Sequence, residues 1–145
     1  MSEILHLTLK NDLGEIEQLN LQLEEFGSKH NLHTEELYAL NLCLEEIVTN
    51  VIRYAWPEGG EHFCEVTVNV NEQEIKIVVE DDGLPFNPCE VPEPDVSKPA
   101  AQRKIGGLGI HLVRQSMDHM GYLYADHKHI LMLDKRRKAA PSAAA

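Results

Sequence analysis

The sequence predicts an α/β fold, a two-layer sandwich in which a mostly antiparallel sheet carries its helices on one face. Apolar residues alternate with period two, as in strands, at 2–10, 63–70, 74–81, 122–126 and 129–135. They recur every three or four positions, as in helices, at 13–30, 34–55 and 110–120. The resulting order is β-α-α-β-β-loop-α-β-β, in which the last four strands form two hairpins and hairpin partners are antiparallel.

The first strand and the first helix follow from this spacing. Between Ser2 and Lys10 the leucines occupy alternate positions, which is typical of a strand with one buried face. Residues 13–30 change to helical spacing. Gly27 marks the expected end of this helix, because glycine is favoured just after a helix.

The second predicted helix is the longest. Thr34 is a suitable N-cap, and Glu35 and Glu36 follow in the first turn, where the helix dipole favours carboxylates. Pro57 stops the helix near Ala55. Its expected apolar stripe consists of Leu37, Leu40, Leu44, Ile47, Val51 and Tyr54.

The remaining elements form two hairpins separated by a long connection. Residues 85–109 are rich in proline and glycine, and a connection of this length is usually functional or disordered. The final hairpin is expected to turn at Asp126-His127-Lys128. We predict one domain over 1–138 and a disordered tail over 139–145, and we interpret the basic cluster at 135–138 as solvated.

The composition argues against several classes of protein. A formal net charge of −11 disfavours nucleic acid as a partner, since phosphate binding needs a clustered basic surface. The three cysteines are scattered, which indicates a reducing compartment and neither a disulfide framework nor a zinc site. The N-terminus is too polar for a signal peptide, and no apolar run reaches the roughly 20 residues of a membrane span. We therefore expect a cytoplasmic protein that does not contact the membrane.

A first motif lies on the long helix, in LEEIVTNVIRY. Glu46 and Asn50 are four residues apart, so they share one helix face, which we expect to lie opposite the apolar stripe. A carboxylate and an amide at this spacing can hold a hard cation or position a water. The alternative is a solvated surface pair.

A second motif ends a strand, in VEDDGLPFNP. A turn needs one aspartate at most, so the pair Asp81-Asp82 requires a further explanation. An aspartate at a strand end can accept a hydrogen bond from an amino group on a ring, and Gly83 lets the backbone approach that ring closely. The alternative is a simple Asx-turn.

A third motif opens a helix with three glycines in four residues, in GGLGIHLV at 106–113. The free N–H groups and the dipole of a helix start form an anion site, whereas the alternative is a flexible loop before a helix. The Walker sequence is excluded because no Gly-Lys-Ser/Thr follows. The dinucleotide-binding fingerprint is excluded because no strand precedes the glycines.

Taken in this order, the motifs resemble the N, G1 and G2 boxes of the histidine-kinase-like ATPases, the GHKL superfamily with the Bergerat-type fold. EEIVTNVIRYA is similar to the N box of the bacterial anti-sigma factor serine kinases. GGLGIHLVRQSMDHMGY is similar to their G2 box and the helix behind it. The likeness extends over residues 34–135 and is weaker before them.

The resemblance implies a role for each motif residue. Asp81 would read the adenine amino group, with Gly83 behind it and Asp82 facing solvent. Asn50 would hold Mg2+ against the phosphates of ATP, and Glu46 would act as the general base. The phosphates would lie on Gly106, Gly107, Leu108, Gly109 and Ile110, beneath a lid formed by residues 88–107.

Two positions depart from the family pattern. Pro85 stands where the G1 box usually has a second glycine, which leaves the mobility of the lid and the fit of adenine open. A small polar residue is usual near His129, which leaves the contacts at this position open.

The resemblance implies an ATP-binding anti-sigma factor with protein serine/threonine kinase activity. Its substrate would be an anti-anti-sigma protein of the STAS type, its other partner a sigma factor, and its state a homodimer. One alternative is an ATP-dependent interaction module, which has less need of Glu46. Another is the catalytic domain of a sensor histidine kinase, but no helical hairpin with a phosphoacceptor histidine precedes the N box.

Overall fold

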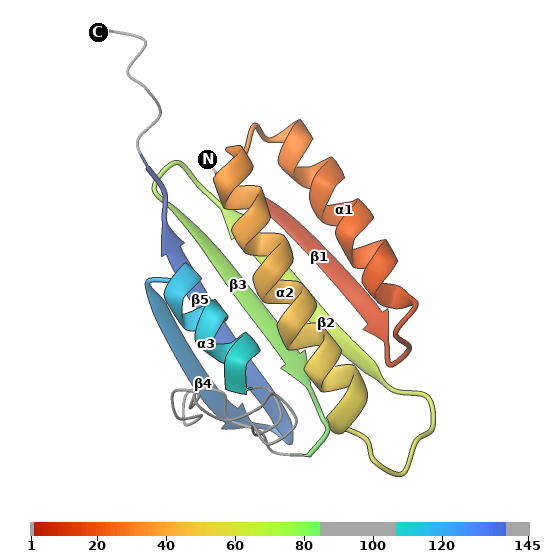
Figure 1. The fold of residues 1–145 in the computed structure, drawn as a ribbon. Coiled ribbons are helices and arrows are strands. Elements are labelled where there is room, and N and C mark those ends of the chain that lie inside the picture. The colour runs from red at the N-terminus through yellow and green to blue at the C-terminus, as the bar shows by residue number, and fades with distance from the viewer. Residues whose placement is uncertain (1, 85–106, 139–145) are drawn as a thin grey trace, which may run out of the picture.

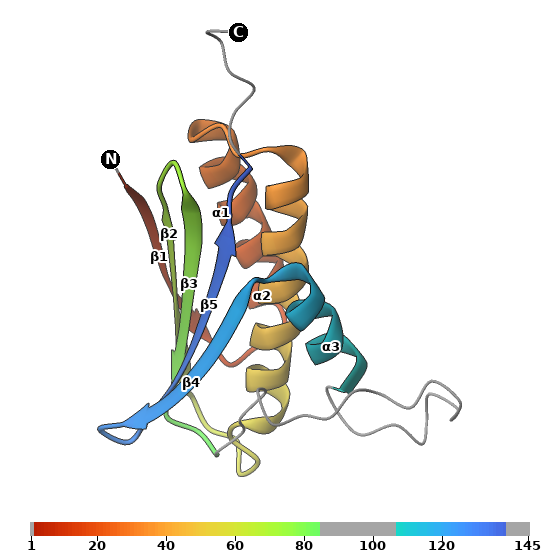
Figure 2. The ribbon, with the colours of Figure 1, turned by 90° about the vertical axis from the view of Figure 1, so that its left-hand side faces the viewer.

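A computed structural model of the chain describes residues 2–84 and 107–138. Its elements are β1 (Glu3–Lys10), α1 (Glu15–Lys29), α2 (Thr34–Tyr54), β2 (Phe63–Val70), β3 (Glu74–Asp81), α3 (Gly107–Ser116), β4 (His119–Ala125) and β5 (Lys128–Arg136). The strands form one sheet in the order β1-β2-β3-β5-β4, and every neighbouring pair is antiparallel. Figure 2 shows the helices on one face of this sheet, which confirms the predicted fold class.

The core lies between α1, α2 and the covered face of the sheet. Alternate residues of β2 and β3 point into it, among them Val66, Val68, Ile75 and Ile77, because side chains along a strand alternate between faces. Figure 1 shows α2 running across the middle of the sheet, beside α1. Among the described residues, no helix combines the length and the apolar character needed to cross a membrane.

The predicted stripe of α2 is largely confirmed, since Leu40, Leu44 and Ile47 are buried. Tyr54 is the exception. It is the last residue of the helix and is 43% exposed.

Several predicted element ends are wrong. Gly27 does not end α1 but is buried inside it, where an added Cβ would lie 2.9 Å from a methyl of Leu37 on α2. The N-cap of α2 is His33 and not Thr34, because the Glu36 carboxylate accepts from the His33 backbone N–H at 2.9 Å. Gly27 and the His33 cap therefore both lie where α1 and α2 meet.

The last hairpin begins earlier than predicted. Helix α3 ends at Ser116, and Met120, although it fits the helical spacing, pairs with Leu133 in the sheet. The turn consists of Asp126 and His127, with φ of 52° and 62°. Positive φ at both central residues is what a two-residue type I′ hairpin turn requires, so Lys128 already belongs to β5.

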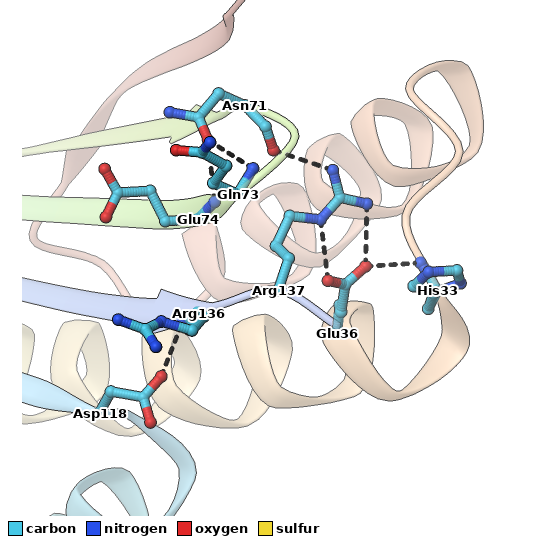
Figure 3. Close-up of polar contacts among 8 residues, drawn as sticks. All are labelled: His33, Glu36, Asn71, Gln73, Glu74, Asp118, Arg136 and Arg137. Atoms are coloured by element: carbon cyan, nitrogen blue, oxygen red, sulfur yellow. Dashed lines mark hydrogen bonds and ion pairs between the residues drawn. The ribbon is translucent and has the colours of Figure 1, made fainter. Parts of the chain in front are cut away.

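The interpretation of residues 135–138 as solvated is wrong for Lys135 and Arg137, which are half-buried, and Figure 3 shows the contacts of Arg137. Arg137 donates from Nε and Nη2 to the two carboxylate oxygens of Glu36, at 2.9 and 3.1 Å, and from Nη1 to the carbonyl of Asn71 at 3.0 Å. Glu36 is only 5% exposed, and a buried carboxylate needs a charged partner. Arg136 and Lys138 are exposed, as expected, and Lys138 pairs with exposed Glu35.

Candidate active site

The first motif lies in the second half of α2. Asn50 donates from Nδ2 to Oε1 of Glu46 at 3.1 Å, which confirms that the two side chains share a face. Both are half-buried, whereas the adjacent Glu45 is exposed. The pair is therefore not the solvated surface pair of the alternative interpretation.

The start of α3 lies against this pair. A Cβ added to Gly109 would lie 1.9 Å from Oε1 and 2.6 Å from Cγ of Glu46, so only glycine permits this approach. Gly109 is in the first turn of α3, where backbone N–H groups have no intrahelical partner and the helix dipole is positive. The carboxylate of Glu46 therefore lies beside a local positive potential.

The predicted phosphate-binding residues differ in whether their side chains are available to a ligand. Gly107 and Leu108 begin α3, and Ile110 is 1% exposed, so its side chain belongs to the core and only its backbone can face a ligand. Gly106 lies outside the described residues. So do Pro85, the predicted lid up to residue 106, and the predicted tail over 139–145.

The second motif forms the turn that follows β3. Gly83 donates its N–H to Oδ1 of Asp81 at 2.9 Å, so the Asx-turn of the alternative interpretation is present. That bond uses one carboxylate oxygen and leaves the other for a ligand. Burial raises the pKa of the Asp81 carboxyl, and the Gly83 N–H and His129 oppose that rise. Partial desolvation of this kind strengthens a hydrogen bond made to the carboxylate.

Asp82 is exposed, as the resemblance implied, but it also has a partner within the protein. The indole Nε1 of Trp56 donates to Oδ1 of Asp82 at 3.0 Å, and the Trp56 ring stacks on His62 with 4.9 Å between centroids. The two adjacent aspartates therefore serve different purposes. Asp81 faces the helices, and Asp82 joins the turn to the segment after α2.

Ala55 and Trp56 are the residues that the sequence analysis missed. A Cβ added to Gly83 would lie 2.4 Å from Cβ and 2.6 Å from the carbonyl oxygen of Ala55, and Leu84 donates its N–H to that carbonyl at 2.8 Å. Gly83 is thus required by packing, since its φ is not left-handed. The one signal for Ala55 was a small residue at the end of the N-box sequence.

The motifs meet along one helix. Gly109 contacts Glu46, and Gly83 contacts Ala55, nine residues further along, which corresponds to about 14 Å at 1.5 Å per residue. Asn50 lies between them. Figure 1 shows the end of β3, the start of α3 and the C-terminal half of α2 at one end of the molecule. This arrangement suits an elongated ligand with an amino-bearing ring at one end and an anion at the other.

The metal-binding capacity of the site is limited. Among the described residues, no three His, Cys, Asp or Glu side chains come together to hold a metal. Since Glu46 engages Nδ2 of Asn50, the amide oxygen Oδ1 is directed to the other side of the amide group. One oxygen ligand of this kind fits Mg2+, which takes most of its ligands from phosphates and water when it accompanies a nucleotide.

Comparisons with known proteins show which family this chain is similar to. The histidine kinase-like ATPase domain family matches residues 9–135. The chain is 28% identical over 118 residues to the serine-protein kinase RsbW of Listeria monocytogenes, covering 77% of this chain and 74% of that protein. It is 24% identical over 104 residues to the serine/threonine-protein kinase BtrW of Bordetella bronchiseptica, covering 72% and 73%.

A solved structure has the same fold. The RsbU and RsbW domains from Mycobacterium tuberculosis superpose with a TM-score of 0.60 at 13% identity, covering 94% of this chain and 34% of that one. The family match extends over most of the chain and includes all three motifs. The chain therefore belongs to the histidine kinase-like ATPase domain family.

Proposed function

We propose that this protein is an ATP-dependent protein serine/threonine kinase that binds ATP along the C-terminal half of α2. The observation that carries the proposal is that two glycines pack along one helix. Gly83, in the turn after β3, packs on Ala55, and Gly109, in the first turn of α3, packs on Glu46. Asp81 accepts a hydrogen bond from the adenine amino group at one end. The N-terminus of α3 receives the phosphates at the other.

Glu46 is the general base of the proposed reaction. Its carboxylate takes the proton of a serine or threonine hydroxyl as that oxygen forms a bond to the γ-phosphorus. The bond from this phosphorus to the bridging oxygen of ADP breaks. Asn50 fixes the carboxylate through its bond to Oε1. Phosphoryl transfer depends mostly on positioning and on neutralising charge, so these few side chains suffice.

Mg2+ is part of the proposal. The amide oxygen of Asn50 would hold it, and the ion would neutralise charge on the phosphates when bound. The absence of a carboxylate cluster among the described residues is consistent with a metal that arrives with the nucleotide.

The proposed substrate is an anti-anti-sigma protein of the STAS type, with a sigma factor as the competing partner and a second copy of the chain as a dimer partner. This proposal is supported by the likeness of the N and G2 boxes to those of anti-sigma factor kinases. It is also supported by two relatives, one named a serine/threonine-protein kinase and one a serine-protein kinase. The chain matches 73% and 74% of their lengths. The substrate hydroxyl must approach from the side of α2 on which Glu46 lies.

The chemical stability of the product tests the proposal. The purified protein is incubated with γ-labelled ATP, Mg2+ and STAS-type proteins encoded in the same genome. Label on a partner that survives acid supports serine or threonine phosphorylation. Acid-labile label on this chain would indicate a histidine kinase instead. ATP-dependent capture of a partner without any transfer of label would indicate an interaction module.

A further inference from the structure

His129 lies at the centre of a polar cluster beside the proposed nucleotide site. Among the described residues, the buried polar side chains are Glu36 and His129, each 5% exposed. His129 pairs with Asp81 of β3 on one side and with Tyr124 of β4 on the other, so the three side chains share the helix-covered face of the sheet. A buried polar group is costly unless it is hydrogen-bonded, so the partners of His129 define its role.

Both ring nitrogens of His129 have partners. Nε2 is 2.7 Å from the carbonyl oxygen of Gly83, and Nδ1 is 2.5 Å from the hydroxyl oxygen of Tyr122. Because a carbonyl only accepts, Nε2 carries the proton. In the neutral ring Nδ1 then accepts from Tyr122. The ring also stacks on Tyr124, with 4.8 Å between centroids, so its tautomer and its orientation are both fixed.

The partner of His129 is Gly83, the same residue whose N–H bonds the Asp81 carboxylate. Gly83 donates its N–H to Oδ1 of Asp81 and accepts from His129 through its carbonyl. Its α-carbon packs against Ala55, and the next residue, Leu84, donates to the Ala55 carbonyl. The backbone of Gly83 and Leu84 is thus held by β3, by β5 and by the C-cap of α2 at once. Removing His129 would release the hydrogen bond that β5 donates to the Gly83 carbonyl.

We propose that His129 is a positioning residue for the nucleotide: by holding the Gly83 carbonyl it fixes the Gly83 backbone, whose N–H in turn holds Asp81 with its second oxygen toward the adenine amino group. Tyr122 supports this role because it holds the imidazole ring. His129 acts through Gly83 and does not itself contact the reacting atoms. This inference rests on the proposed function, since it assumes that Asp81 reads adenine.

The test measures the coupling between His129 and one group of the ligand. Calorimetry compares Mg-ATP with purine riboside triphosphate, which lacks the 6-amino group, for the wild-type protein and for His129→Ala. If His129 orients Asp81 toward that group, the variant weakens ATP binding by about tenfold or more and leaves the affinity for the analogue nearly unchanged. A purely structural role would weaken both ligands by the same factor, and that result would overturn the proposal.

Two further variants keep the test decisive if His129→Ala fails to fold. Tyr122→Phe removes only the hydroxyl that holds Nδ1, and we expect a smaller loss of affinity than for His129→Ala, again confined to ATP. His129→Gln retains a donor for the Gly83 carbonyl, so any loss of affinity that it shows should also be confined to ATP. Wild-type ATP affinity in Tyr122→Phe, or an equal loss for both ligands in His129→Gln, would contradict the proposal.

Controls separate this inference from the proposed function. His127 is exposed two residues earlier, at a position with positive φ that asparagine tolerates, so His127→Asn should bind both ligands like the wild type. If the wild-type protein does not bind ATP at all, the proposed function fails and this inference fails with it. If the wild type binds and His129→Ala loses affinity for both ligands equally, only this inference fails.

Discussion

Two glutamates of helix α2, Glu36 in its first turn and Glu46 in its second half, have opposite surroundings. Glu36, near the N-terminus, is 5% exposed and receives hydrogen bonds from the Arg137 guanidinium and the His33 backbone. Glu46, ten residues later, is half-buried, accepts from Asn50 and lies against a glycine of α3. The two glutamates therefore differ in how completely their oxygens are engaged, which is consistent with a structural role for Glu36 and with the chemical role that we propose for Glu46.

The electrostatics of Glu36 agree with a structural role. Burial raises the pKa of its carboxyl, but the hydrogen bonds and charge of Arg137 and the His33 backbone outweigh burial, and the net pKa is lowered. Toward the other end, Gly109 lets α3 approach Glu46, and Gly83 lets the turn after β3 approach Ala55. One end of α2 is therefore closed by a guanidinium, whereas Glu46 and Asp81 toward the other end are half-buried and remain accessible.

Glu46→Gln should produce the largest effect. We expect phosphoryl transfer to fall by ~10²–10⁴-fold, because a positioned general base contributes about that much, while ATP affinity stays near the wild-type value. Transfer of labelled phosphate to the partner measures the rate. Glu45→Gln, at the exposed neighbouring position, is the matched control and should transfer normally. Equal rates in the wild type and Glu46→Gln would remove Glu46 from the mechanism.

Arg137→Ala should produce the largest loss of stability. Removing one member of a buried ion pair leaves the other charge uncompensated, which typically costs about 3–5 kcal/mol in the free energy of unfolding. Urea denaturation measures this quantity. Lys138→Ala, which breaks the neighbouring exposed pair with Glu35, should cost at most about 1 kcal/mol. If both variants lost only a similar small amount of unfolding free energy, the ion pair at the closed end of α2 would contribute little to stability.

Gly109→Ala should disturb the accessible end of α2 and leave the surroundings of Glu36 unchanged. The new methyl group would overlap the Glu46 side chain, and relieving such an overlap typically costs about 1–3 kcal/mol. We expect slower phosphoryl transfer because the Glu46 carboxylate is displaced. The matched control is Gly121→Ala, whose new methyl group would lie 3.6 Å from the terminal methyl of Met132, an ordinary contact. Normal transfer in Gly109→Ala would show that Glu46 does not depend on this contact.

The stability contributed by Glu36 should depend on pH. Because its pKa in the folded protein is lower than the ordinary value of 4.5, its contribution is fully present above pH 4.5 and is lost as the pH falls through the lowered pKa. Unfolding of the wild type and of Glu36→Gln, followed between about pH 7 and about pH 3, should show that loss only in the wild type. Parallel curves for the two proteins would assign acid sensitivity to other groups.

The sequence predicted the sheet, the helices and the three motifs, because apolar periodicity and motif order are local properties. It did not predict the partners of Arg137, since Glu36 lies 101 positions earlier and only the fold brings them together. The same reason explains the missed contact of Gly83 with Ala55. The prediction that the last helix extends to Met120 was wrong because an apolar residue at helical spacing can also belong to a strand. In the structure Met120 pairs with Leu133 in the sheet.

Calorimetry of Mg-ATP binding to the wild type, Asp81→Asn and Lys138→Ala tests most directly the claim that nucleotide binds at the accessible end of α2. The introduced amide would keep the oxygen that the Gly83 N–H needs but would present an NH2 group to the adenine amino group. We expect Asp81→Asn to raise Kd by about 5–150-fold, equivalent to about 1–3 kcal/mol, while Lys138→Ala binds like the wild type. An unchanged Kd in Asp81→Asn, with the fold intact by circular dichroism, would contradict the claim.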